Sequence, residues 1–165
     1  EPRHVWRALL EATHVAKPCV VARRSLLEKA GLFDPALVVA GDQDMWIRLS
    51  LLGGVGLVPE ALVKAHDTPN SLTKKYAARV ADFVLPMIKK HIEHEKTRLA
   101  STEVNKILAS RYSSVGRNLY SKGELLRGAY YLIAAAMRGH RVGENLWYLF
   151  TASPAVKWIK VLCRG

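Results

Sequence analysis

A change of pattern near residue 70 constrains the fold of this chain more than any other feature. Before it, the predicted elements are short, and proline or glycine separates them. After it, hydrophobic residues recur every three or four positions through residues 72–139, which is the spacing of one helix face. We therefore expect two regions, a mixed α/β region over residues 1–70 and an all-helical region over residues 71–165.

In the front region, short helical patterns alternate with short apolar runs. Amphipathic spacing predicts helices over residues 4–12, 25–31 and 42–52. Runs rich in β-branched residues predict strands or extended segments over residues 17–24, 55–58 and 61–65. The expected fold class is an α/β front with few strands, followed by an all-α helical region.

In the back region, one pair of helices is predicted as an antiparallel hairpin. A single hydrophobic stripe over residues 101–122 predicts a helix that stops at Gly123, and a second helix follows over residues 124–139. Pro86 should kink or break the helix predicted before this pair, because a proline inside a helix removes a backbone hydrogen bond.

The charge of the chain is unevenly distributed. Residues 1–70 hold eight Lys/Arg and eight Asp/Glu, whereas residues 71–165 hold seventeen and six. In the basic region, Lys and Arg alternate with aromatic residues near Trp147, Phe150 and Trp158. This pattern is typical of a helix lying at a membrane surface. It favours an anionic membrane as a partner over nucleic acid, because no nucleic-acid-binding motif accompanies the charge.

Two further features bear on location. Cys19 and Cys163 are the only cysteines, which gives no disulfide framework and suits a reducing compartment. The longest charge-free stretches are too short to span a bilayer. We expect a cytoplasmic protein, with peripheral attachment to the inner face of the membrane.

The segment "GDQDMWIRL", residues 41–49, allows two interpretations. In the first, Asp42 caps a helix, Asp44 and Arg48 form an exposed ion pair at i, i+4, and Trp46 is a core residue. In the second, one of the two carboxylates takes part in catalysis. The neighbouring sequence decides between these interpretations.

Several ordered pieces surround this segment. They are "VVARR", "SLLEKAG", "LFD", "GDQDMWIRL", an apolar pair of runs around Pro59-Glu60, and "HDTPNSL". In this order and spacing, over about residues 15–73, they resemble the second half of the catalytic domain of a family 2 glycosyltransferase with the A-type nucleotide-sugar fold. The resemblance implies transfer of a sugar from a nucleotide-sugar donor to a glycan or lipid-linked acceptor.

The resemblance also implies roles for individual residues. Asp42 takes the place of the general base that deprotonates the acceptor hydroxyl, and Asp44 is a rival base two residues away. The family's glutamate before this aspartate falls on Gly41, a departure that puts the shape of the acceptor site in doubt. The candidates for substrate binding are Arg23, Arg24, Trp46 and Arg48.

A divalent cation, manganese or magnesium, is implied for the intact enzyme, and His66 is a candidate to ligate this ion or to donate a hydrogen bond to a phosphate. The family's Asp-x-Asp cation motif and nucleotide-binding half have no counterpart before residue 15. We therefore expect this chain to be a C-terminal portion that holds the acceptor side. Alone, it should bind no cofactor and be inactive. His91 and His94, spaced i, i+3, could hold a metal or belong to a solvated face.

A different class of function remains open. The helical region over residues 71–165 could itself be the functional part, as a basic module that binds a membrane surface or a protein without catalysis. The two classes are compatible, because a transferase acting on lipid-linked acceptors benefits from a basic, aromatic face near anionic lipid.

Overall fold

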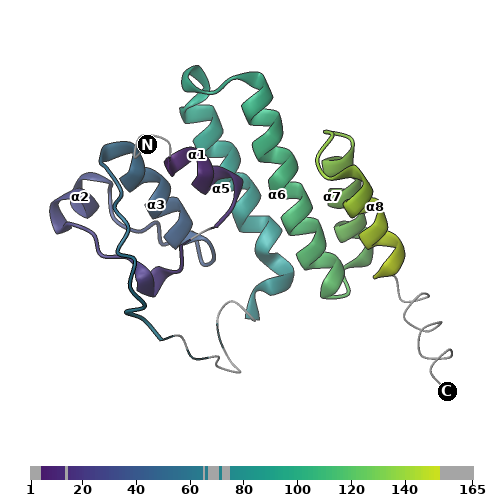
Figure 1. Cartoon of the computed structure of the whole chain (residues 1–165), viewed down its shortest axis with the longest axis horizontal. Coiled ribbons are helices and arrows are strands. Elements are labelled where there is room, and N and C mark those ends of the chain that lie inside the picture. Colours follow the sequence, from purple (N-terminus) through teal and green to yellow (C-terminus); the bar gives the residue numbers. More distant parts are fainter. Residues whose placement is uncertain (1–4, 14, 65, 67–70, 72–74, 153–165) are drawn as a thin grey trace. The chain divides into compact units, whose positions relative to one another are not determined.

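The computed structural model describes residues 5–13, 15–64, 66, 71 and 75–152 (Figure 1). The chain forms two compact units, residues 1–96 and residues 97–165, and each is described by itself. The helix α5 (Val80–His94) follows the boundary that the sequence predicts at residue 70, but it belongs to the first unit.

The first unit is built from short helices joined by extended segments. In chain order these are α1 (Val5–Glu11), the 3-10 helix η2 (Lys17–Cys19), α2 (Arg24–Lys29), α3 (Gly41–Leu52), the 3-10 helix η3 (Ala77–Arg79) and α5. Helices α1 and α3 pack together, burying Trp6 and Leu10 against a core that includes Met45 and Ile47. The side chain of Gln43 joins the two helices, because its amide nitrogen donates to the carbonyl oxygen of Leu9 at 2.6 Å.

Helix α5 presents a regular buried stripe. The buried residues are Ala81, Val84, Leu85, Met87, Ile88 and His91, which recur at helical spacing. Pro86 lies inside this helix and does not break it, since α5 continues from Val80 to His94. A proline costs one backbone hydrogen bond, and burial of the stripe offsets that loss.

The prediction of an α/β front was wrong. Among the residues that the structure describes there is no strand, and the segments predicted as strands are coil apart from the short helical turns that overlap the first of them. Val21 and Leu57 are almost fully exposed, at 101% and 89%. Runs of β-branched residues indicate only that a strand is locally acceptable; a stable strand also needs a paired neighbour and a buried face. No described segment supplies either.

Over its described residues, 97–152, the second unit is mainly helical. It contains α6 (Ser101–Ser121), α7 (Leu125–Ala136) and α8 (Val142–Thr151), and the 3-10 helix η4 (Lys96–Arg98) spans the division between the units. Gly123, at φ 91°, adopts the left-handed conformation that reverses the chain between α6 and α7. The sequence predicts the helix stop at this glycine.

Helices α6 and α7 approach very closely at two glycines. A Cβ atom on Gly128 would lie 2.6 Å from the backbone nitrogen of Tyr120, and one on Gly116 would lie 2.9 Å from the backbone nitrogen of Leu132. Both distances are too short for real contacts, so the two backbones approach at positions where only glycine fits.

Polar bonds attach α8 to this hairpin. Asn145 is fully buried, accepts a hydrogen bond from Ser113 Oγ at 2.8 Å and donates one to the carbonyl oxygen of His140 at 2.8 Å. Tyr120 Oη donates to the carbonyl oxygen of Leu149 at 3.1 Å. None of the helices in the described part of the chain combines the length and the apolar composition that a membrane span requires.

Candidate functional site

The candidate site lies at the start of α3, within the first unit. Ala40, at φ 66°, precedes the helix in the left-handed conformation, and α3 begins at Gly41. Asp42 and Asp44 therefore both fall in the first turn, where carboxylates are stabilised by the helix dipole and by free backbone N–H groups. Asp42 is the second helical residue and does not occupy the N-cap, contrary to the capping interpretation.

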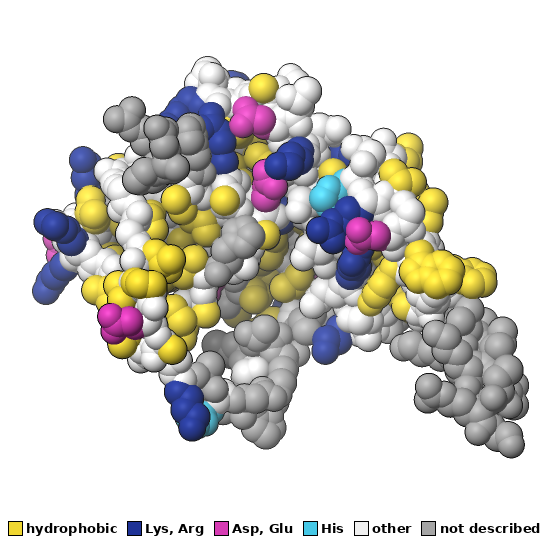
Figure 2. Space-filling view, viewed as in Figure 1, with side chains coloured by type: hydrophobic (Ala, Val, Ile, Leu, Met, Phe, Trp, Pro, Cys, Tyr) yellow, Lys and Arg dark blue, Asp and Glu magenta, His cyan; other side chains and the backbone are white. Residues whose placement is uncertain are grey.

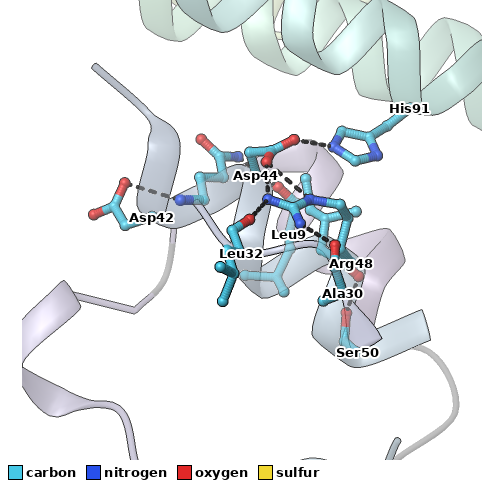
Figure 3. A network of polar contacts seen from close by, with 10 residues as sticks. Leu9, Ala30, Leu32, Asp42, Asp44, Arg48, Ser50 and His91 are labelled. Carbon is cyan, nitrogen blue, oxygen red and sulfur yellow. Dashed lines mark hydrogen bonds and ion pairs between the residues drawn. The ribbon is translucent and has the colours of Figure 1, made fainter. Parts of the chain in front are cut away.

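Asp44 is held by two partners, one on each carboxylate oxygen (Figure 3). Its Oδ2 accepts from Arg48 Nε at 2.9 Å and from Arg48 Nη2 at 2.5 Å, and its Oδ1 bonds to His91 Nε2 at 2.8 Å. The i, i+4 pair with Arg48 is the pair predicted by spacing. It is not on an exposed face, however, because Asp44 is only 6% exposed.

Arg48 also fixes the backbone that follows α2. Its Nη1 donates to the carbonyl oxygen of Ala30, and its Nη2 donates to the carbonyl oxygen of Leu32 at 2.8 Å. Leu32, at φ 61°, lies in a conformation that is uncommon for residues other than glycine. The guanidinium of Arg48 is thus engaged within the protein, where it has a structural role, and its role in substrate binding stays a prediction.

The Asp44 network determines the charge state of that carboxyl group. Burial by itself would raise the pKa of Asp44, but the hydrogen bonds from His91 and Arg48, together with their Coulombic attraction, outweigh burial. The pKa of Asp44 is therefore lowered from its ordinary value of 3.8. Asp44 stays ionised at neutral pH and is a weak base, since its proton affinity is reduced by the same partners that hold it.

Asp42 differs from Asp44 in its burial and in its contacts. It is half-buried, and its Oδ1 accepts a hydrogen bond from the backbone nitrogen of Gln43 at 2.8 Å. Within the described ranges, no other hydrogen bond or ion pair joins its carboxylate. In Figure 3, its side chain points away from the contacts that Asp44 makes with Arg48 and His91. Asp42 is therefore the acid of this pair that remains open to an incoming group.

His91 is a residue of the candidate site whose bond to Asp44 is not predicted by the sequence. Its spacing with His94 suggested a metal pair or a solvated face, and the structure has neither: His91 is 5% exposed and bonded to Asp44. The hydrophobic pattern of α5 does indicate that His91 is buried. His91 lies three positions after Ile88 and seven after Val84, so it shares their buried stripe.

A pocket of about 460 Å³ opens beside this network. It is lined by residues of both signs of charge and by an apolar turn, including Phe33, Asp34, Asp44, Arg48, Lys90, His91, His94 and Glu95. Asp42 is not part of this lining. The pocket thus adjoins the side of α3 that carries Asp44, and it brings Lys90 and His94 of α5 close to the turn after α2.

The other predicted site residues are not brought together. Arg23 and Arg24 are exposed at the start of α2, where Arg24 pairs with Glu28 at 2.8 Å. Trp46 is buried, and its ring meets the ring of Phe33 edge-on at a centroid distance of 6.2 Å. These contacts agree with the first interpretation of residues 41–49, in which Trp46 is a core residue.

His66, the predicted metal ligand, is an exposed coil residue. In the portion of the chain that the structure covers, no group of three or more His, Cys, Asp or Glu side chains could hold a metal ion. The divalent cation that the resemblance implies for the intact enzyme stays a prediction, as does the role of His66 toward it.

Comparison with known proteins yields no relative: no protein-family model, no curated protein and no solved structure matches this chain.

Proposed function

We propose that this chain provides the acceptor side of a glycosyltransferase, with Asp42 as the general base. The observation that carries the proposal is the division of roles between the two acids of α3. Asp44 is bound on both oxygens by Arg48 and His91, whereas Asp42 has a single backbone contact among the described residues. Only Asp42 combines a rigid position at a helix start with a carboxylate open to substrate.

The chemistry required of Asp42 is proton transfer. As the acceptor hydroxyl oxygen forms its bond to the anomeric carbon of the donor sugar, the bond from that carbon to the nucleotide's phosphate oxygen breaks. The hydroxyl proton passes to the carboxylate of Asp42, which strengthens the nucleophile as the bond forms. The nucleoside diphosphate departs with the electron pair of the broken bond.

Asp44, Arg48 and His91 are positioning residues in this proposal. The i, i+4 pair fixes one side of the first two turns of α3, and the His91 bond connects that helix to α5. Arg48 extends the same network to the backbone at residues 30–32. A base must be held within a fraction of an ångström of its working position, and this network supplies the rigidity.

The test is transfer activity in the natural protein that contains residues 1–165, using nucleotide-sugar donors and glycan or lipid-linked acceptors. Asp42→Asn keeps the shape of the side chain and removes the proton acceptor. We expect kcat to fall by about 100-fold or more, with the KM for the donor little changed. Glu28→Gln, which alters an exposed carboxylate on α2, is the matched control and should retain activity.

Asp44→Asn distinguishes a base from a positioning residue. We expect it to lower the thermal midpoint as well as the turnover number, because it disrupts the network with Arg48 and His91. If Asp42→Asn remains near wild-type while Asp44→Asn abolishes turnover at unchanged stability, the assignment of the base to Asp42 is wrong.

A further inference from the structure

Helix α7 is apolar on two opposite faces. One face packs in the interior of the second unit through Gly128, Leu132 and Ala135. The other is turned outward and carries Leu126, Tyr130 and Ile133, and the C-cap residue Met137 continues their stripe at helical spacing. A helix that is hydrophobic all round is normally buried all round. Leu126 is 89% exposed and Met137 is 83% exposed, so this stripe lacks a covering partner in the described unit.

Helix α8, which packs against α7, adds aromatic residues to the exposed apolar surface. Trp147 and Phe150 are 66% and 64% exposed, and their ring centroids lie 6.2 Å apart. Leu146 is half exposed beside them. Hydrophobic side chains gather at the surface of this unit near α8 (Figure 2). We refer to the exposed apolar residues of α7 and α8 together as the α7–α8 face.

We propose that the α7–α8 face docks on an anionic lipid membrane, with both helices lying in the interface. Three observations select lipid as the occupant. The first is composition: exposed Trp, Tyr and Phe with long aliphatic side chains are the residues that settle at the boundary between headgroups and acyl chains. The second is length, because neither helix is long and apolar enough to cross the bilayer.

The third observation is charge. Residues 97–152 hold eight Lys/Arg and three Asp/Glu, so the unit that carries the face is strongly basic. A basic surface is attracted by anionic headgroups, each basic residue near the surface adding to the binding. The same excess opposes association with a second copy of this unit, because two basic units repel one another. Charge complementarity therefore favours the membrane over self-association.

The experiment is co-sedimentation of the 165-residue chain with vesicles of phosphatidylcholine containing phosphatidylserine, and with vesicles of phosphatidylcholine alone. The test variant combines Leu126→Gln, Met137→Gln and Trp147→Gln. The matched control combines Val21→Gln, Leu57→Gln and Leu62→Gln, which change equally exposed apolar residues of the first unit. Circular dichroism checks that both variants keep their helix content.

We expect the wild-type chain to bind the anionic vesicles and the neutral ones much more weakly. The face variant should lose about tenfold or more in partitioning, because three apolar side chains no longer leave water. The control variant should bind as the wild type does. Binding should weaken as salt is raised, since screening shortens the reach of the basic residues.

A second variant keeps the proposal testable even if the triple variant fails to fold. Trp147→Phe preserves the apolar face, so it should bind vesicles normally, yet quenching of tryptophan emission by brominated lipid should fall. The proposal would be overturned if the face variant partitioned onto vesicles as well as the wild type does, or if the control variant lost as much binding as the face variant. It would also be overturned if the wild type did not bind the vesicles. Concentration-dependent dimers that only the face variant abolishes would identify a second copy as the occupant instead.

Discussion

Different kinds of contact stabilise the interior of each of the two units. In the first, side chains bond across long sequence separations: Arg48 reaches the carbonyl groups of Ala30 and Leu32, and His91 reaches Asp44, 47 residues away. In the second, polar bonds also attach α8, but α6 and α7 meet backbone to backbone at glycines. The first unit therefore depends on a few polar groups whose loss leaves partners unsatisfied, and the α6–α7 pair of the second unit depends on the absence of side chains at two glycines.

The difference teaches where each unit is vulnerable. A buried polar network loses most when one member is removed, because the remaining charges stay buried without compensation. A close helix crossing loses most when an atom is added, because the backbones must then separate. Opposite kinds of substitution, deletion in one unit and addition in the other, should thus be the damaging ones.

The largest effect is expected from removing Asp44. Asp44→Ala leaves the side chains of Arg48 and His91 without their shared partner, and we expect the free energy of unfolding to fall by about 3 kcal/mol. Urea unfolding followed by circular dichroism measures the loss. Amide hydrogen exchange should locate it in residues 5–52 and 80–94, which form the elements around the network.

The control for this prediction is an exposed glutamate–arginine pair at the same i, i+4 spacing in the same unit. Arg24 and Glu28 form an ion pair with the same separation, but their side chains are 92% and 56% exposed. Glu28→Ala should cost less than about 0.5 kcal/mol, since water replaces the lost partner. Equal losses for the two substitutions would show that burial of the Asp44 network contributes nothing.

The next largest effect is expected in the second unit, from a substitution that adds side-chain volume instead of removing it. Gly128→Ala adds one methyl group where the Tyr120 backbone leaves no room, so we expect a loss of about 2 kcal/mol despite the better helix propensity of alanine. Gly143→Ala is the control, because a Cβ there meets nothing within 4 Å. It should be neutral or stabilising by up to about 1 kcal/mol. A Gly128→Ala protein as stable as the wild type would mean that the helices separate freely.

The same difference between local and long-range contacts explains which features of the fold the sequence alone can predict. The stripe of α6 and the stop at Gly123 are local patterns, and residue spacing alone predicts both. The close approach at Gly128 is not a local pattern, because it depends on which residue of the partner helix lies opposite. Helices were therefore predictable in the second unit, and their crossing was not.

In the first unit, the predicted strands failed for a related reason. Val21 and Leu57 have the propensity for a strand, but pairing depends on distant segments that propensity does not specify. The spacing of Asp44 and Arg48 predicted their pairing correctly and its burial wrongly. The bond from Asp44 to His91 of α5 could be found only by treating His91 as part of the buried hydrophobic stripe of that helix.

A smaller effect is expected from acid, and it tests the charge of the Asp44 network. The pKa of Asp44 is lower in the folded protein than its ordinary value of 3.8, so the unfolded state binds the proton more readily. The stability that ionised Asp44 contributes is therefore complete above pH 3.8 and is lost as the pH falls below it toward the folded pKa.

Asp44→Asn isolates this contribution, because it keeps the shape of the side chain and cannot titrate. At pH 6 we expect the variant to be less stable than the wild type by about 1 kcal/mol. The gap should narrow as the pH falls below 3.8, while the titration of other carboxylates affects both proteins alike. Thermal melts between pH 6 and acid conditions measure it, and a gap that widens on acidification would contradict the assigned direction of the pKa.

The smallest effect on stability should come from Asp42, the residue to which we assign the chemistry. Its carboxylate accepts one hydrogen bond from the Gln43 backbone, and asparagine can accept the same bond. What Asp42→Asn loses is the attraction between a charge and the first turn of α3, which at a half-exposed position is about 0.5 kcal/mol. Urea unfolding of Asp42→Asn should therefore nearly superimpose on that of the wild type.

This small effect sharpens the comparison between the two acids of α3. Substitution of a residue that stabilises the fold should lower the stability and the activity of the protein together, and we expect this for Asp44. Substitution of a residue that performs proton transfer should lower activity and leave the unfolding curve unchanged, because a general base contributes to the reaction rate and not to the stability of the fold. If Asp42→Asn destabilises the protein as much as Asp44→Ala does, Asp42 is part of the structural network, and the open carboxylate on which the proposed mechanism depends does not exist.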